Sequence, residues 1–350
     1  MARELGVSVA TVSNAYNHPE RVSPQVRERI LRHAELVRYP GPNPMARQLS
    51  KGYTETLGLV FREELPHAFR HAAAVGFLDG LAQACTHAGY NLLLVPSNPE
   101  NLDRPISSVS SAAVDGCVAF SMGDDDPDLL SAIGRGQPVV IVDQPSPLAG
   151  VGWVGLDDRA ATRDVVRRLV QLGHRNFGVL TIRTGSHEHE GLLPESGLSN
   201  SRYRVPRERM EGVQDALREA HLSPHVPTVE TFNISTAAAE TALDVLLKAD
   251  PDITAIVSFD DELAIGAIRA AAARGLSVPG DLSITGFDDI PAAAAVGLTT
   301  VRQPLIEKGL KAGELLLAGI RKGSTRPLEQ PPMITLPTEF VQRGSIGPAK

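Results

Sequence analysis

Acidic residues directly follow several short apolar runs in this 350-residue sequence. Carboxylates and a guanidinium that converge on one site can exchange hydrogen bonds with several hydroxyl groups, which suits a polyol ligand. The alternative is that each aspartate caps the helix that follows its apolar run, as Asp often does. We expect the ligand-binding set to be Asp157, Arg209, Asp260 and Asp288.

The sequence gives little support to catalysis or to a bound metal. It has no P-loop, no Gly-x-Ser-x-Gly motif and no Cys-x-x-Cys motif. The run His-Glu-His-Glu at 187–190 has metal-binding residue types, but it lies in a polar stretch that we expect to be a solvated loop. Adjacent carboxylates could serve a glycosidase, yet nothing favours the separation of roughly 5–9 Å that such enzymes need. We therefore expect no enzyme, no cofactor and no metal.

The first residues predict two helices joined by a tight turn. A short helix that ends at Leu5, a turn at Gly6 and an N-cap at Ser8 would precede the second helix. Val12 and Ala15 can face inward on that helix, while four short side chains face outward. Asparagine can bond adenine in the major groove, and small apolar groups can touch a thymine methyl group. The outward residues are Val9, Ala10, Ser13 and Asn14.

A third helix and a linker follow. Ser23 can cap the third helix, and Pro24 suits its first position. Prolines mark the linker after Tyr39, where Asn43 can cap a helix of a few residues. A helix that short is unstable alone, so we expect it to fold only against DNA or a second copy of the chain.

From residue 56 onward, apolar runs alternate with helical patterns. This alternation is typical of an α/β fold with a doubly wound parallel sheet. It occurs twice, which predicts two lobes, and ligands of such folds bind outside the carboxyl ends of the strands. The expected strands are 57–61, 92–95, 116–120, 139–142, 177–180, 255–257 and 283–287, and the expected helices are 73–88, 128–135, 159–172, 208–220 and 263–274.

Motifs along nearly the whole chain resemble those of the lactose-repressor (LacI/GalR) family of transcription regulators. The head carries Gly-Val-Ser-Val-Ala-Thr-Val-Ser, and the linker carries Pro-Asn-Pro-Met-Ala-Arg-Gln-Leu. The body carries Leu-Gly-His-Arg, Arg-Met-Glu-Gly, Asp-Glu-Leu-Ala-Ile-Gly and Gly-Phe-Asp-Asp. These motifs lie at 6–13, 42–49, 172–175, 209–212, 261–266 and 286–289. The resemblance implies an N-terminal helix-turn-helix head on a two-lobed, periplasmic-binding-protein-like body.

The resemblance also implies which residues contact DNA. Val9, Ala10 and Asn14 would read bases, while other polar residues of the same helix would touch the DNA backbone or hold the turn. Leu49 would wedge into the minor groove at the centre of the site, with Arg47 beside it on the hinge helix. The full expected set is Ser8, Val9, Ala10, Thr11, Ser13, Asn14, Asn17, Arg47 and Leu49.

Domain boundaries follow from the same resemblance. We expect the head at 1–40, a hinge helix at 41–51, the first lobe at 55–172 and 304–328, and the second lobe at 173–303 and 329–345. Family heads carry several residues before the first helix. We therefore expect the natural start to lie upstream of Met1 and the first helix to be truncated in this sequence. In the body, the resemblance implies Asp157, Arg209, Asp260 and Asp288 as ligand contacts.

Charge is distributed unevenly along the chain. Residues 1–51 contain eight Lys and Arg against four Glu, a net charge of +4. Because the whole chain carries a net charge of −7, the remaining residues carry −11. A basic head on an acidic body keeps the attraction for a polyanion local to the head. Two cysteines and no long apolar segment lead us to expect a cytoplasmic protein without a membrane partner.

These features predict a regulator that binds double-stranded operator DNA as a homodimer. A small polar effector, expected to be a sugar or related polyol, would control the DNA affinity. The competing hypothesis is a solute-binding protein of a sugar transporter, whose body would look similar. The basic head and the lack of a signal segment disfavour that hypothesis, and a sugar-modifying enzyme ranks third.

Overall fold

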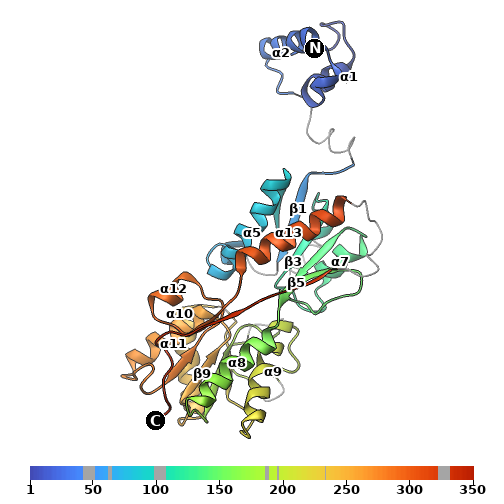
Figure 1. Ribbon diagram of the computed structural model, residues 1–350. Coiled ribbons are helices and arrows are strands. Elements are labelled where there is room, and N and C mark those ends of the chain that lie inside the picture. The colour runs from blue at the N-terminus through green and yellow to red at the C-terminus, as the bar shows by residue number, and fades with distance from the viewer. Residues whose placement is uncertain are drawn as a thin grey trace. The chain divides into compact units, whose positions relative to one another are not determined.

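The computed structural model describes residues 1–41, 52–61, 65–97, 108–185, 189–194, 197–232, 234–321 and 332–350. The chain forms two compact units, Met1–Thr54 and Glu55–Lys350 (Figure 1). The expected hinge helix lies almost entirely outside the described residues, because 42–51 are not among them.

The N-terminal unit is built on α1 (Val9–Asn17), a 3-10 turn η1 (Pro19–Arg21) and α2 (Pro24–Leu36). The expected N-caps are confirmed: Ser8 accepts a bond from the Thr11 amide, and Ser23 accepts one from the Val26 amide. Val12 and Ala15 of α1 are buried against Ile30 of α2, as their spacing predicts. This small apolar core fixes the angle at which α1 stands on α2.

The prediction of a helix before Gly6 is wrong. Residues 2–6 form hydrogen-bonded turns, in which the Leu5 amide donates to the Met1 carbonyl and the Val7 amide donates to the Ala2 carbonyl. So few residues cannot form the repeated bonds that stabilise a helix, and Gly6 turns the chain at a φ of 63°.

A six-stranded, wholly parallel sheet forms the first lobe of the body, in the order β12-β5-β4-β3-β1-β2. Helices cover both of its faces, which buries the apolar runs that predicted the strands. Its elements are β1 (Thr56–Phe61), α4 (Leu65–Ala68), α5 (Ala72–Ala88), β2 (Asn91–Pro96), α6 (Ser108–Ser111), β3 (Gly116–Phe120), α7 (Pro127–Gly134), β4 (Val139–Val142), β5 (Gly152–Leu156), α13 (Leu305–Arg321) and β12 (Met333–Leu336).

The second lobe has a five-stranded sheet in the order β10-β9-β6-β8-β7, parallel except for the short edge strand β7. A two-stranded antiparallel sheet, β11 (Thr300–Arg302) with β13 (Glu339–Val341), accompanies the crossings between lobes. The second-lobe elements are α8 (Asp158–Gln171), β6 (Phe177–Thr181), β7 (Gly191–Leu192), α9 (Arg204–Glu219), β8 (Thr228–Glu230), α10 (Thr236–Ala249), β9 (Ala255–Ser258), α11 (Asp261–Ala273), β10 (Ser283–Thr285) and α12 (Pro291–Ala295).

Two expected lobe boundaries are corrected by the packing. Helix α8, expected in the first lobe, packs on α9 of the second, where a Cβ on Gly212 would lie 2.3 Å from the Arg159 carbonyl oxygen. Strand β12, expected in the second lobe, pairs in register with β5 of the first. Both errors have one cause: sequence pattern predicts a helix or a strand but does not say which sheet it joins.

Two helices of the first lobe, α5 and α13, lie unusually close together. A Cβ on Gly80 would lie 1.8 Å from the Ile306 carbonyl oxygen, and one on Gly309 would lie 2.1 Å from the Phe77 carbonyl oxygen. Only glycine fits such a contact between backbones. The start of α13 is therefore held firmly against α5, and both helices begin near the charged cluster described below.

Candidate functional site

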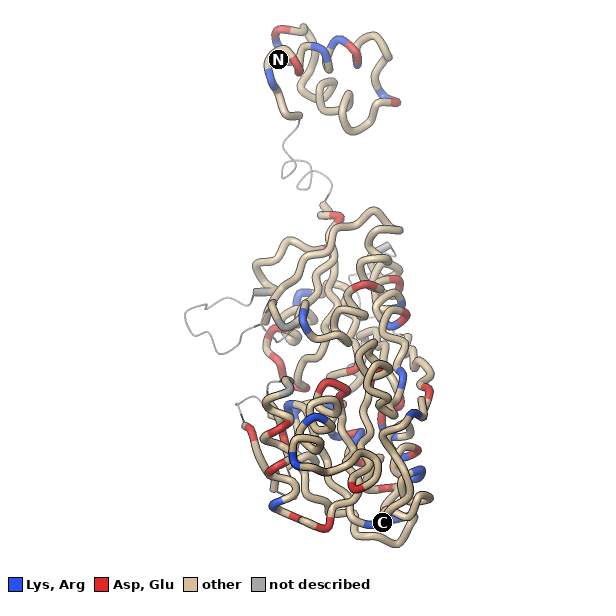
Figure 2. Tube along the Cα trace, turned by 90° about the vertical axis from the view of Figure 1, so that its left-hand side faces the viewer, with Lys and Arg blue, Asp and Glu red and all other residues tan. Residues whose placement is uncertain are grey.

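The outward face of α1 in the N-terminal unit carries short side chains, and its first residues are exposed. Val9 is 77% exposed, and Ala10 is also exposed; both directly follow the Ser8 cap. Ser13 and Asn14 lie one further turn along the same face and are half-buried. Lys and Arg residues are spread along this small unit (Figure 2). A protruding helix end with short side chains has the shape that fits a major groove.

The other predicted DNA-contacting residues at α1 are engaged in local hydrogen bonds. The Ser8 and Thr11 hydroxyls are 2.8 Å apart, and the Asn17 amide donates to the Ser13 hydroxyl at 3.3 Å. These bonds fit the expectation that this set holds the turn or touches the DNA backbone. Arg47 and Leu49 lie outside the described residues.

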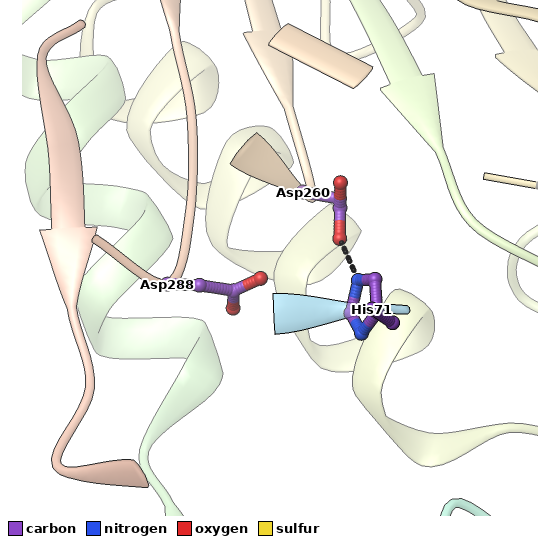
Figure 3. Close-up of side chains that lie close together, drawn as sticks. All are labelled: His71, Asp260 and Asp288. Atoms are coloured by element: carbon purple, nitrogen blue, oxygen red, sulfur yellow. Dashed lines mark hydrogen bonds and ion pairs between the residues drawn. The ribbon is translucent and has the colours of Figure 1, made fainter. Parts of the chain in front are cut away.

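A buried polar cluster joins the two lobes of the body (Figure 3). The Asp260 Oδ2 atom lies 2.9 Å from Nε2 of His71, and ligand atoms of His71, Asp260 and Asp288 all lie within 4.8 Å of one another. His71 is the N-cap residue of α5 in the first lobe, whereas the two aspartates follow the neighbouring strands β9 and β10 in the second. The carboxyl ends of two adjacent strands thus face a cation from the other lobe.

Asp260 and Asp288 are held tightly in their positions. Asp260 also caps α11, since its Oδ1 accepts from the Glu262 and Leu263 amides. Asp288 adopts a φ of 121°, a conformation that residues other than glycine rarely take. Such strain persists where surrounding structure over-determines it, and it concentrates at functional sites.

Arg209 reaches the same cluster from α9. Its Nε donates to Asp158 Oδ1 at 2.9 Å, and its Nη1 donates to the Phe259 carbonyl oxygen. The guanidinium carbon lies 3.4 Å from the centre of the Phe287 ring, a stacked cation–π contact. Arg209 is 5% exposed, so these contacts replace most of its solvent.

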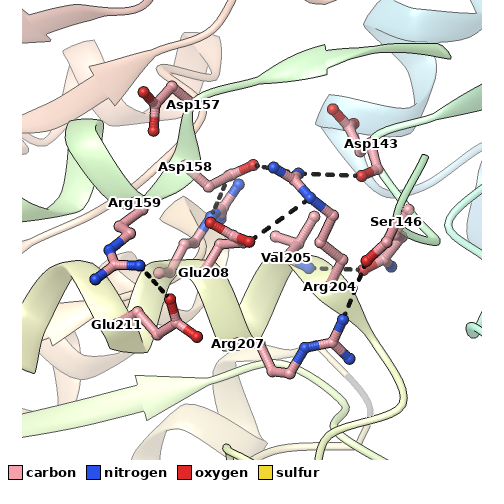
Figure 4. Close-up of polar contacts among 12 residues, drawn as sticks. Asp143, Ser146, Asp157, Asp158, Arg159, Arg204, Val205, Arg207, Glu208 and Glu211 are labelled. Carbon is pink, nitrogen blue, oxygen red and sulfur yellow. Dashed lines mark hydrogen bonds and ion pairs between the residues drawn. The ribbon is translucent and has the colours of Figure 1, made fainter.

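Asp157 does not join this cluster. It is exposed, and its side chain caps α8 by accepting a bond from the Ala160 amide at 2.9 Å (Figure 4). Its neighbour Asp158 is fully buried and pairs with Arg209. Arg204 of α9 lies 3.7 Å from Asp158 and donates to the Asp143 carbonyl oxygen, so this contact also bridges the lobes. Of the four predicted ligand residues, the structure therefore brings together Arg209, Asp260 and Asp288.

A second chain of contacts extends from Asp288 to the first lobe. Gln303, after β11, donates its amide to Asp288 Oδ1 and accepts a bond from Lys308 Nζ. Lys308 also donates to Asp143 Oδ2 at 2.8 Å. Sequence reasoning missed His71, Asp158, Gln303 and Lys308. One signal was available, because Lys308 falls on the apolar stripe of its helix with Ala312 and Leu316.

Burial and mutual repulsion govern the electrostatics of the cluster. Burial, together with the charge of Asp260, raises the pKa of Asp288 to about 7. Burial and the Asp288 charge raise the pKa of Asp261 to about 8. Burial alone would lower the pKa of His71, but the hydrogen bond and charge of Asp260 outweigh it and raise that pKa to about 10. His71 is therefore an imidazolium at neutral pH, and it balances one carboxylate.

The cluster is poorly suited to a metal ion. His71 is protonated at neutral pH and paired with Asp260 at 2.9 Å, so its ring has no free nitrogen lone pair to offer a metal. In the other candidate stretch, His189 and Glu190 are exposed, and 187–188 are not described. The sequence also contains one Gly-x-Gly-x-x-Gly run, at 150–155. It runs into β5 and does not form the strand-to-helix turn that a dinucleotide site requires.

None of the helices in the described part of the chain is both long enough and apolar enough to cross a bilayer.

Each of the two units matches a known protein family. Residues 1–40 match the model of bacterial regulatory proteins of the lacI family, and residues 166–346 match that of a periplasmic binding protein-like domain. The HTH-type transcriptional regulator Rv3575c of Mycobacterium tuberculosis is 41% identical over 350 residues, which cover 99% of this chain and 96% of the relative.

Solved structures show the same fold. A crystal structure of a LacI-family transcriptional regulator from Corynebacterium glutamicum has a TM-score of 0.75 at 35% identity, covering 100% of this chain and 97% of that chain. The complex of the transcriptional regulator CelR with cellobiose has a TM-score of 0.67 at 24% identity and covers 98% of both chains. At that identity the second likeness concerns the fold alone.

Proposed function

Because the chain belongs to the LacI family of bacterial transcription regulators, which are not enzymes, we propose that it is an effector-controlled repressor. It would bind a pseudo-palindromic operator as a homodimer in the cytoplasm, through the outward face of α1. Its effector would be a small polyhydroxylated molecule, of which a sugar is the leading class. The observation that carries this proposal is the buried polar cluster, which is assembled from both lobes and lies at the carboxyl ends of β9 and β10.

The head supports base reading by a few residues. Val9 and Ala10 are exposed at the start of α1, and Asn14 follows one turn later. A helix placed this way presents its N-terminal residues to base edges. A two-fold symmetric dimer would present two such helices to two half-sites. The predicted hinge contacts Arg47 and Leu49 stay part of the proposal.

The body supports recognition of hydroxyl groups. Asp260 and Asp288 can only accept hydrogen bonds when ionised, and Arg209 can only donate. An effector whose hydroxyls replace the His71–Asp260 contact, or bridge it, would change the balance between lobe arrangements. A coupling of about 1–3 kcal/mol between effector and DNA corresponds to roughly 5–150-fold in affinity. We expect the effector to release DNA.

The competing solute-binding function has less support. It shares the two-lobed body, but it leaves the N-terminal unit and its match to lacI-family heads without a role. A transport protein of that kind would bind the same effectors and show no preference among DNA sequences.

The test is selection of duplexes from a random library by the whole chain, followed by fluorescence anisotropy on the enriched sequence. A panel of neutral monosaccharides, disaccharides and polyols, including cellobiose, is then added to the complex. We expect an enriched palindrome and at least one panel member that weakens binding. Enrichment of no sequence, together with sugar binding, would favour the solute-binding function instead.

A further inference from the structure

Lys308 is a buried cation within the first turn of α13. It is 1% exposed, although lysine is among the residues least often buried. Its ammonium group donates to Asp143 Oδ2 at 2.8 Å and to the Gln303 side-chain oxygen. Asp143 follows β4 of the first lobe, so the ammonium group lies between a strand end of that lobe and the crossing segment after β11.

The chemistry of Lys308 fixes the orientation of the Gln303 amide. An ammonium group has three donors and no acceptor, so the amide must turn its oxygen toward Lys308. The amide nitrogen then points the other way and donates to Asp288 Oδ1. A lysine at this position thus makes Gln303 a donor toward the cluster.

The ion pair with Asp143 keeps this arrangement in place. A buried ammonium group is strongly unfavourable without a partner, and Asp143 is the carboxylate within reach of it. The close packing of α13 on α5, through Gly80 and Gly309, leaves little freedom for the backbone that carries Lys308. Charge pairing and helix packing therefore both hold the ammonium group against Gln303.

We propose that Lys308 is a positioning residue that sets the hydrogen-bond polarity of the effector site, by holding Gln303 as a donor to Asp288. This inference rests on the proposed function in assigning Asp288 to the effector. When Asp288 is ionised, above its pKa of about 7, it can only accept hydrogen bonds, and one of its oxygens is engaged by Gln303. An effector at this carboxylate must donate a hydrogen bond, which selects hydroxyl groups and disfavours phosphate and carboxylate groups.

The test measures the carboxylate of Asp288 without effector or DNA, so that it does not depend on the proposed function. The 13C carboxyl signal of Asp288 is titrated in the whole chain and in Lys308→Met, with Lys308→Arg as the conservative variant. Lys311→Met, which removes an exposed lysine of the same helix, is the matched control. The groups facing Asp288, namely Asp260, Asp261, His71 and Arg209, are the same in every variant.

We expect Lys308→Met to raise the pKa of Asp288 from about 7 to about 8, because the donor that stabilises its charge is no longer enforced. Lys308→Arg should keep the pKa near its original value, and Lys311→Met should not change it. In a Gln303→Met background, the further change Lys308→Met should have no effect. An unchanged pKa of Asp288 in folded Lys308→Met would overturn the proposal. So would a rise of the same size when Lys308→Met is added to Gln303→Met.

Lys308→Met leaves Asp143 without its cation, which can prevent folding. The double variant Lys308→Met with Asp143→Asn removes the charge and the unpaired carboxylate together. It should fold and show the same rise in the pKa of Asp288. A folded double variant with the original titration would equally refute the relay through Gln303.

Discussion

The contact between His71 and Asp260 predicts how the stability of the body depends on pH. Replacing His71 by glutamine removes the positive charge but keeps a polar side chain at the start of α5. The pair is well shielded, with side chains 14% and 3% exposed, and its atoms are 2.9 Å apart. The two residues belong to different lobes, so the variant tests the link between the lobes as well as the pair itself.

The size of the effect follows from the pKa of His71, which rises from 6.5 to about 10 in the folded chain. A raised pKa means that the stabilisation is fully present below pH 6.5 and is lost as the pH rises through 10. Linkage then gives about 3 kcal/mol at pH 7.5, falling to about 1 kcal/mol at pH 9.5. The difference in unfolding free energy between the wild-type chain and His71→Gln should therefore fall from about 3 to about 1 kcal/mol over this pH range.

The assay is denaturant unfolding at several pH values, followed by the fluorescence of Trp153, the one tryptophan in the sequence. His87→Gln, at the exposed end of the same helix, is the control and should show no such trend. In an Asp260→Asn background, His71→Gln should lose its pH-dependent effect. A wild-type advantage that stays constant from pH 7.5 to 9.5 would refute the assigned ion pair.

Three further predictions concern the head, the cluster and the helix packing. Asn14→Ala should weaken binding to the selected operator by about 1–3 kcal/mol in anisotropy while binding to random duplex barely changes; equal loss on both would count against base reading. Asp288→Asn should abolish the response of the DNA complex to the active panel member and leave operator affinity unaltered, and a normal response would remove this residue from the effector site. Gly80→Ala should lower the melting temperature of the body, because its Cβ would lie 1.8 Å from the Ile306 carbonyl oxygen, whereas Gly134→Ala, with no atom within 4 Å, should not.

Much of the site could be found from sequence because strand ends have a recognisable pattern. A carboxylate directly after an apolar run lies at the carboxyl edge of a parallel sheet, and Asp260 and Asp288 are indeed neighbours there. The same pattern suggested Asp157, which instead caps α8 from an exposed position. Capping and ligand binding use the same residue type at the same place, so local sequence could not separate Asp157 from Asp158.

Local periodicity and capping chemistry determined the elements of this protein from its sequence: Ser8 and Ser23 begin helices, Val12 and Ala15 face inward, and alternating apolar runs form parallel sheets. Only the tertiary structure decided which sheet α8 and β12 join, and which distant side chains meet. His71 and Asp260 are 189 positions apart, and Lys308 and Asp143 are 165 apart. Their pairing depends on how two lobes and three crossings pack, a property of the whole body that no stretch of local sequence contains.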